Sequence, residues 1–162
     1  MGTVQIREKE AGDEAWVETV LNERWGARGR IVVHGQVIDA CTLPALIAGA
    51  REGIATFRVE RNSEPIFAEI VTLDALASNR GIGTALVDGI VSKLRAERIG
   101  VLRVTTTNDN LNALRFYQKR GFHIVAVRPG AVDISRRLKP EMHLIGEFGI
   151  PIRDEIDLEQ LL

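Results

Sequence analysis

Apolar residues recur at helical spacing in three stretches of the chain. The first predicts a helix over about 13–23, with one apolar stripe formed by Trp16, Val17, Val20 and Leu21. The second predicts a longer helix over 81–98, in which apolar residues recur every four positions: Ile82, Leu86, Ile90 and Leu94. The third, over 111–120, stops at Gly121. A further short helix is expected inside the segment 129–149, which is too long for a simple hairpin loop.

Runs of β-branched and apolar residues predict the strands. These lie at about 4–7, 30–33, 36–40, 54–59, 66–73, 101–107 and 122–127. From Ile150 onward apolar and charged residues alternate, which predicts a half-buried final strand with its charged side chains in solvent. Strands and helices are therefore mixed along the chain around one sheet, as in an α+β or mixed α/β domain.

Length and charge narrow the class of protein. The 162 residues suit a single domain, taken here as 1–162. Lys and Arg total 21 and Asp and Glu total 22, so the net charge of −1 argues against a nucleic acid or an anionic membrane as partner. The single cysteine, Cys41, excludes an internal disulfide and a multi-cysteine zinc site. Without a long apolar run or an apolar leader, the sequence predicts a cytoplasmic protein.

A glycine-containing loop between a strand and the long helix is the most informative local feature. It reads Ser78-Asn79-Arg80-Gly81-Ile82-Gly83-Thr84. Glycines at the start of a helix let a ligand approach backbone N–H groups that have no intrahelical partner, and phosphate suits those donors. A nucleotide-binding P-loop would need Gly-Lys-Ser/Thr, which is absent, and a dinucleotide site would need a third glycine where Leu86 stands.

A second motif follows about 25 residues later, in the run from Asn110 to Phe122. Together the two segments resemble the GNAT N-acetyltransferase superfamily, whose hallmarks are Gln/Arg-x-x-Gly-x-Gly/Ala and then Asn-x-x-Ala-x-x-x-Tyr-x-x-x-Gly-Phe. Gly81 and Gly83 match the first, and the second is matched by Asn110, Ala113, Tyr117, Gly121 and Phe122. Ser78 replaces the leading Gln or Arg, and Ala75 replaces a proline usual three residues earlier. The resemblance in element order covers roughly residues 3–128.

The resemblance implies a fold, a cosubstrate and a set of binding residues. The fold is a twisted, mostly antiparallel sheet of about seven strands with flanking helices, splayed between its fourth and fifth strands. The cosubstrate is acetyl-CoA, the partner is an amine acceptor, and a homodimer is common in the family. The residues that would hold acetyl-CoA are Leu73, Ala75, Ser78, Asn79, Arg80, Gly81, Ile82, Gly83, Thr84, Asn110, Ala113 and Phe116. Among them, the Leu73 N–H would polarise the thioester carbonyl, and Asn110 would steady the pantetheine arm.

Two catalytic residues are expected from the same resemblance. Tyr117, the only tyrosine, would protonate the departing thiolate, since a phenol with a pKa near 10 can supply a proton to a thiol with a pKa near 8.5; the alternative is a core residue. Glu69 would deprotonate the amine from a strand face shared with Phe67, Val71 and Leu73, or would instead pair with Arg58 across the sheet. Asp74, on a strand face expected to be solvated, is the weaker candidate.

The remaining polar residues are assigned structural roles. The three histidines, His34, His123 and His143, are scattered, so no metal site is expected. Asn108 and Asp109 are expected to cap the following helix. Arg136, Arg137 and Lys139 are expected to form a solvated face, with the grip of an acidic substrate or of the CoA 3′-phosphate as the alternative. An inactive CoA-binding module and a purely structural domain remain as alternatives to the enzyme.

Overall fold

The computed structural model describes residues 3–26, 29–77 and 80–162. Within that part the chain forms two compact units. The first contains the described residues of 1–30 and 39–102 together with Leu162, and the second contains 31–38 and 103–161. A single domain over 1–162 stays a prediction. None of the helices in the described ranges is both long and apolar enough to cross a membrane.

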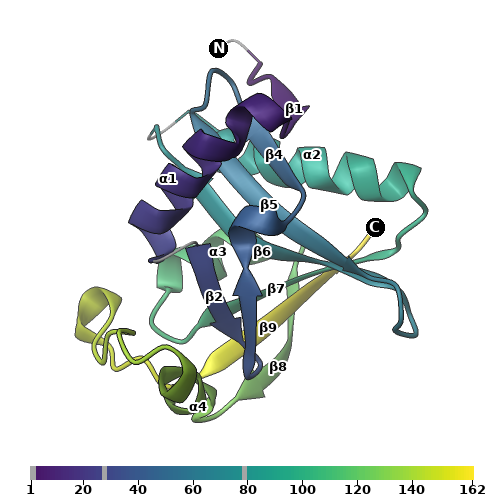
Figure 1. Cartoon of the computed structure of the whole chain (residues 1–162). Helices are drawn as coiled ribbons and strands as arrows, with labels where there is room; N and C mark the ends of the chain where they lie inside the picture. The colour runs from purple at the N-terminus through teal and green to yellow at the C-terminus, as the bar shows by residue number, and fades with distance from the viewer. Residues whose placement is uncertain (1–2, 27–28, 78–79) are drawn as a thin grey trace. The chain divides into compact units, whose positions relative to one another are not determined.

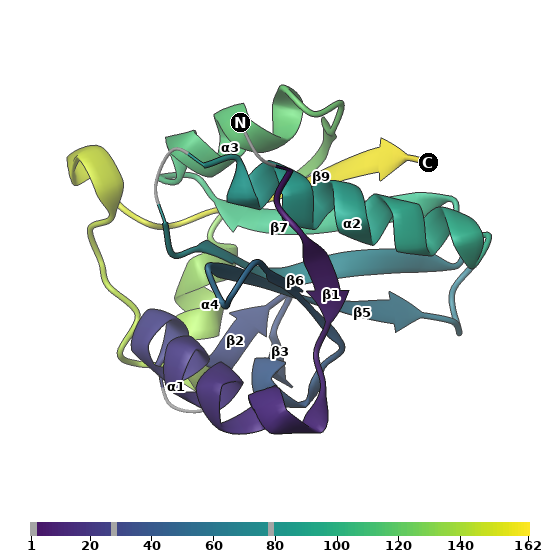
Figure 2. The ribbon, with the colours of Figure 1, turned by 90° about the horizontal axis from the view of Figure 1, so that it is seen from above.

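Within the described residues, the first unit contains two helices and four of the strands. Its strands are β1 (Ile6–Glu8), β4 (Ala45–Ala48), β5 (Gly53–Glu60) and β6 (Phe67–Ala75). Its helices are α1 (Glu14–Trp25) and α2 (Ile82–Ala96), with 3₁₀ turns at Ala11–Asp13 and Ala40–Thr42. The strands are neighbours in the order β1-β4-β5-β6, and each adjacent pair is antiparallel. The helices α1 and α2 lie on opposite faces of these strands (Figure 2).

Strand β4 was not predicted from the sequence. All four of its residues are buried, so its Ala-Leu-Ile-Ala sequence lacks the alternation of a half-exposed strand. The other predicted strands of this unit are confirmed to within about two residues. Helix α1 is confirmed too, with Val17, Val20 and Leu21 buried on its inner face.

Close packing against β5 fixes the start of α2. Ile82, the first residue of the helix, and Leu86 one turn later are buried at Gly53. A Cβ at Gly53 would lie 2.4 Å from Ile82 Cγ2 and 2.9 Å from the carbonyl oxygen of Asp74. Glycine therefore allows the end of β6 and the first turn of α2 to meet β5 at one point. This contact sets where the first turn of α2 lies.

The second unit contains the remaining elements (Figure 1). They are β2 (Arg30–Val33), β3 (Gln36–Asp39), β7 (Val101–Thr107), α3 (Leu111–Gln118), β8 (His123–Arg128), α4 (Ala131–Leu138), a 3₁₀ turn (Glu147–Gly149) and β9 (Glu155–Leu161). Strands β2 and β3 form a two-stranded sheet, and the others are neighbours in the order β7-β9-β8. Helix α4 confirms the short helix expected after residue 129. The final strand begins at Glu155, later than the alternation from Ile150 predicts.

Strand β9 buries two charged side chains that the sequence prediction places in solvent. Glu155 and Asp157 are buried, with exposed fractions of 3% and 7%. Asp157 accepts hydrogen bonds from Thr105 Oγ1 at 2.8 Å and from Nε and Nη2 of Arg128 at 3.0 and 2.7 Å. Glu155 accepts from the backbone N–H of His34 at 3.2 Å and from Ser135 Oγ at 3.3 Å. The burial of two carboxylates is thus compensated by donors from four other segments of the unit.

His34 completes this cluster and is not the isolated histidine that the sequence suggests. It occupies the β2–β3 turn, and its Nε2 lies 2.8 Å from Asp157 Oδ1 and 3.8 Å from Glu155 Oε2. The hydrogen bond to Asp157 raises the pKa of the imidazole against the opposing effect of burial. Burial alone would raise the pKa of Asp157, but the hydrogen bonds from His34, Thr105 and Arg128 lower it to about 2. The β2–β3 turn is therefore attached to β9 by a charge-assisted contact.

We predict that Gly53→Ala destabilises the protein without a change of charge. The added methyl group must displace Ile82 or the backbone at Asp74, which we expect to lower the free energy of unfolding by about 1–3 kcal/mol. Urea denaturation measures the change. Gly100→Ala is the control, because no atom lies within 4 Å of a Cβ placed there. Equal stability of the two variants would contradict the close packing at Gly53.

We predict a pH-dependent loss of stability in His34→Asn. A histidine whose pKa is raised in the folded state stabilises that state fully below its unfolded pKa, and this contribution disappears as the pH rises through the folded pKa. Wild type should therefore exceed the variant in stability at about pH 6, and the difference should shrink by about pH 9. Asparagine suits the positive φ of 50° at this position. His123→Asn, at an exposed position of β8, is the control variant.

Candidate active site

A β-bulge in β6 decides which side chains share a face. Thr56 of β5 is opposite Thr72, whereas the next residue, Phe57, is opposite Ile70, so Val71 is the extra residue. Cross-strand partners share a face of a sheet. Glu69 therefore lies on the same face as Thr72 and Asp74. Strict alternation would instead place it on the face of Leu73. The expected grouping of Glu69 with Leu73 is wrong for this reason, whereas the grouping with Phe67, opposite Glu60, is confirmed.

This face of β5 and β6 carries a row of paired polar side chains. Glu69, only 4% exposed, accepts hydrogen bonds from Nε and Nη2 of Arg58 at 2.8 and 2.7 Å. One step along the row, the hydroxyl groups of Thr56 and Thr72 lie 2.7 Å apart and are buried. The ion pair between Glu69 and Arg58, one of the two alternatives for this carboxylate, is confirmed. The catalytic role of Glu69 stays a prediction.

Asp74 ends the row, and its environment differs from the expected one. It is 9% exposed and not solvated, and it lies on the same face as Glu69. Its Oδ2 accepts a hydrogen bond from the indole Nε1 of Trp25 at 2.7 Å. Burial raises the pKa of Asp74, and neither this hydrogen bond nor the nearby Arg24 cancels that effect. The sequence gives no sign of this contact, since Trp25 and Asp74 are 49 residues apart and belong to different elements.

The glycine loop leads directly into α2. Gly81 is the N-cap residue, with a φ of 70° and a ψ of 16°, and a Cβ placed on it would meet no atom within 4 Å. Gly81 has no side chain that could cap this end of the helix. The first turn of a helix has backbone N–H groups without an intrahelical acceptor, and phosphate suits such donors. Ser78 and Asn79, two of the predicted binding residues, lie outside the described residues.

The other predicted residues of the first unit divide into backbone and side-chain candidates. Ile82 is only 2% exposed, so its side chain belongs to the core and only its backbone can face a ligand. Leu73 is half-buried opposite Ala55, and Ala75 is exposed at the end of β6. Arg80 is exposed and forms an ion pair with Glu52, a partner that the sequence analysis did not identify. The structure thus brings together β6, the loop and the start of α2.

In the second unit, Asn110 and not Asn108 or Asp109 caps α3. Asn110 Oδ1 accepts a hydrogen bond from the Ala113 N–H at 3.0 Å. Asn108 instead accepts from the backbone N–H groups of Arg153 and Asp154 and donates to the carbonyl of Pro151. Asp109 accepts from the Glu147 N–H and from Thr107 Oγ1. The expected cap at Asn108 and Asp109 is therefore wrong, because these residues bind the segment that precedes β9.

Tyr117 lies in an aromatic cluster. It is 5% exposed, and its ring makes edge-to-face contacts with Phe116 and Phe122 at centroid distances of 5.1 and 5.2 Å. The guanidinium of Arg120 lies 3.5 Å from the centroid of the Phe116 ring. The Tyr117 ring is thus packed in the interior, which both the core role and the catalytic role allow, and its catalytic role stays a prediction. Ring packing of this kind also fixes the orientation of the phenol.

One residue of the basic run on α4, Arg136, has a structural role. Arg136 donates to the carbonyl groups of His143 and Ile152, both at 2.7 Å, and its side chain is only 14% exposed. It therefore holds the segment after α4 in place, and a fully solvated face is the wrong interpretation for this residue.

Across the described ranges, no group of three or more His, Cys, Asp or Glu side chains is arranged to hold a metal ion.

The sequence matches one family of known proteins and two related proteins. The model of the Acetyltransferase (GNAT) family matches residues 39–122, more than half of the chain. The uncharacterized protein YdhI of Bacillus subtilis (strain 168) is 50% identical over 88 residues, which cover 54% of this chain and 55% of YdhI. YxbD, another uncharacterized protein of that strain, is 40% identical over 104 residues, or 64% of this chain and 63% of YxbD. The matched regions thus span between half and two thirds of these relatives.

The fold agrees with a solved structure as well. A crystal structure of a GNAT family acetyltransferase from Elizabethkingia anophelis with acetyl-CoA bound matches with a TM-score of 0.71 and 19% identity, covering 100% of both chains. At this identity the likeness concerns the fold, and it confirms the expected mixed α/β architecture with its seven mostly antiparallel strands. The family model, the matched glycine and tyrosine motifs and the fold lead to one conclusion: this chain belongs to the GNAT acetyltransferase family.

Proposed function

We propose that this protein is an N-acetyltransferase that transfers the acetyl group of acetyl-CoA to a primary amine by direct attack in a ternary complex. The observation that carries the proposal is the start of α2, where the N-cap residue is Gly81 and a Cβ placed on it would meet no atom within 4 Å. The family match and the acetyl-CoA bound to the Elizabethkingia anophelis enzyme support the choice of cosubstrate. The acceptor is assigned here only as a primary amine.

The first unit would bind the cosubstrate chiefly through its backbone. The N–H groups from Arg80 to Thr84 would hold the pyrophosphate, because a helix N-terminus favours negative charge. Leu73 and Ala75 would pair with the pantetheine amides in the manner of an added strand, and the Leu73 N–H would polarise the thioester carbonyl. In the second unit, Asn110, Ala113 and Phe116 would support the pantetheine arm. Ser78 and Asn79 would extend the phosphate loop.

The amine must lose a proton as it attacks, and β6 offers two carboxylates for this role. Glu69 was the expected base, but both of its hydrogen bonds to Arg58 hold it in a buried ion pair. Asp74 accepts from a neutral indole, and its pKa is raised by burial, which is the adjustment that a carboxylate base requires. We therefore assign the base to Asp74 and give Glu69 a supporting role in the polar row.

The departing CoA thiolate needs a proton, and Tyr117 is the group assigned to supply it. Its ring is held on both sides by Phe116 and Phe122, so the hydroxyl has a fixed direction. A positioned acid is effective because the proton is transferred as charge develops on the sulfur. This chemistry requires no covalent intermediate on the protein.

The test of the proposal has two stages. In a thermal-shift assay, CoA should raise the melting temperature of the protein, because a ligand that binds only the folded state stabilises that state by mass action. A panel of amines and peptides, assayed for acetyl-CoA-dependent CoA release, should then identify an acceptor. Stabilisation without turnover on any amine would favour the inactive CoA-binding module. No stabilisation by CoA or acetyl-CoA would contradict the proposal.

We predict that Tyr117→Phe reduces turnover selectively. The ring and its contacts remain, so the fold and the dissociation constant for acetyl-CoA should change little. Loss of the acid should lower kcat by roughly 10²- to 10⁴-fold, with a much smaller effect on KM, since the proton is needed only as the thiolate forms. Steady-state kinetics with an active amine measure both parameters. Phe122→Leu, which alters the same cluster without removing a hydroxyl, is the control. Full turnover in Tyr117→Phe would show that the phenol serves packing alone.

We predict that Asp74→Asn and Glu69→Gln separate the two carboxylates. Asp74 acts as a base only when ionised, so wild-type kcat/KM should rise with pH through the raised pKa of Asp74, and Asp74→Asn should remove that limb. The activity of this variant should recover as the pH approaches the pKa of the amine. Glu69→Gln should lower stability, because it removes the charge of a carboxylate that is only 4% exposed and pairs with Arg58. Asp88→Asn, at an exposed position of α2, is the control; a lost limb in Glu69→Gln instead would reverse the assignment.

A further inference from the structure

Glu52, in the turn between β4 and β5, is held firmly by its own backbone. Its N–H donates to the carbonyl of Ala48 and its carbonyl accepts from the Leu76 N–H, both at 2.8 Å. The second of these bonds ties the turn to the residue that follows β6. Glu52 is therefore fixed at both peptide groups beside the start of the glycine loop.

The shape of the turn directs the Glu52 side chain over Gly49. A Cβ at Gly49 would meet the carboxylate end of the Glu52 side chain. Gly49 has a φ of 53°, a backbone conformation that favours glycine. The backbone of the turn therefore requires glycine at this position, and the Glu52 carboxylate lies beside it.

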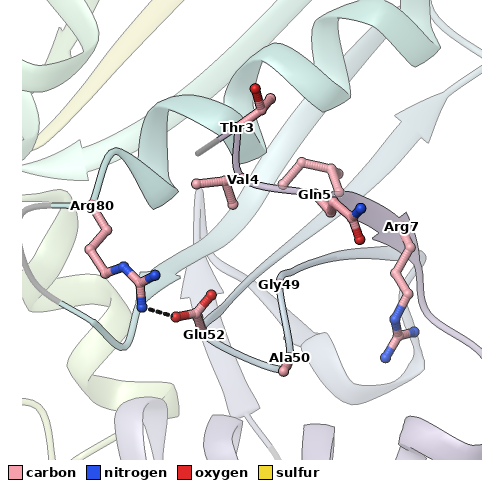
Figure 3. Close-up of a pocket in the computed structure, with 9 residues that line it drawn as sticks. Thr3, Val4, Gln5, Arg7, Gly49, Ala50, Glu52 and Arg80 are labelled. Atoms are coloured by element: carbon pink, nitrogen blue, oxygen red, sulfur yellow. Dashed lines mark hydrogen bonds and ion pairs between the residues drawn. The ribbon is translucent and has the colours of Figure 1, made fainter. Parts of the chain in front are cut away.

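The Glu52 carboxylate forms an ion pair with Arg80 at the edge of a pocket of about 690 Å³ (Figure 3). Thr3, Gln5 and Arg7 line the same pocket from the segment around β1. Arg7 is engaged elsewhere, since both of its terminal nitrogens donate to the buried carboxylate of Asp13, at 2.6 and 2.8 Å. The side chain of Arg80 is 62% exposed and that of Glu52 29% exposed, so water and ligands can reach their pair.

We propose that Glu52 is the resting counter-ion of Arg80 and is exchanged for a phosphate group when acetyl-CoA binds. This inference rests on the proposed function, because it concerns the phosphate loop of that same site. Arg80 directly precedes Gly81, so its guanidinium is within reach of an anion at the start of α2. A carboxylate and a phosphate compete for the same planar donors of arginine. The neighbouring pocket gives the displaced side chains space in which to separate.

The exchange sets the affinity for the cosubstrate. Each binding event must break the Glu52–Arg80 pair before Arg80 can hold phosphate, so the energy of the pair is subtracted from the energy of binding. The nearby carboxylate also repels phosphate as long as it is ionised. Glu52 is therefore a positioning residue that lowers affinity and keeps Arg80 ordered at the loop, and its removal should strengthen binding.

The test is a double-mutant cycle on the full chain with Glu52→Gln, Arg80→Gln and the double variant. Calorimetric titration with CoA should give a dissociation constant about two- to fivefold lower in Glu52→Gln than in wild type, the range expected for an exposed ion pair. In the Arg80→Gln background the same substitution should change the constant by less than about 1.5-fold, because the pair is already absent. Glu97→Gln, which removes the same charge from the pair with Arg61 at the far end of α2, is the matched control and should leave the constant unchanged.

The outcomes distinguish the inference from the proposed function. An unchanged or weaker affinity in Glu52→Gln, or an equal gain in the Arg80→Gln background, would overturn the counter-ion role while CoA binding stands. Inorganic pyrophosphate, which needs only the loop, is titrated in parallel. If none of the four proteins binds CoA, the proposed function is wrong, and the pyrophosphate titrations alone test the counter-ion role of Glu52. A lower dissociation constant for pyrophosphate in Glu52→Gln than in wild type supports that role. An unchanged constant, or no binding of pyrophosphate, overturns it.

Discussion

The extra residue in β6 is the constraint on which the chemistry of the first unit depends. Because Val71 has no partner on β5, the alternation of side chains changes sense between Ile70 and Thr72. Glu69, Thr72 and Asp74 consequently share one face, which carries the indole of Trp25, whereas Leu73 and Ala75 share the other. Without the bulge, the last carboxylate of the strand would lie on the other face, away from Glu69 and the indole.

Three carboxylates of the first unit illustrate how environment determines the role of one functional group. Glu69 is buried and neutralised by the two hydrogen bonds from Arg58, an arrangement suited to holding strands together. Asp74 is buried beside a neutral donor, so its proton affinity is increased. Glu52 is partly exposed and bound to Arg80, where a competing anion can replace it. The same ion, in three settings, stabilises structure at Glu69 and would serve proton transfer at Asp74 and anion exchange at Glu52 in the proposed mechanism.

The second unit also buries carboxylates, and hydrogen-bond donors from several elements surround them. Its strand β9 buries Glu155 and Asp157, and donors from the β2–β3 turn, β7, β8 and α4 converge on them. The aromatic cluster around Tyr117 forms on α3, whose start is capped by Asn110. Asn108 and Asp109, directly before that helix, hold the segment leading into β9. The Asn110 motif therefore lies between two parts of the unit that are each fixed by hydrogen bonds.

The sequence by itself determined the features that depend on local pattern: α2 from its four-residue apolar spacing, and the family from Gly81 and Gly83 together with Asn110, Tyr117 and Phe122. Phosphate binding by the glycine loop is a prediction from the same two glycines. It did not reveal β4, because a strand covered on all sides has no alternation to detect. Only the tertiary structure decided the faces of β6, the burial of Asp74 under Trp25, the partners of His34 and the pairing of Glu52 with Arg80. Each of these depends on a bulge or on contacts between residues distant in sequence, and neither leaves a periodic signal in the chain.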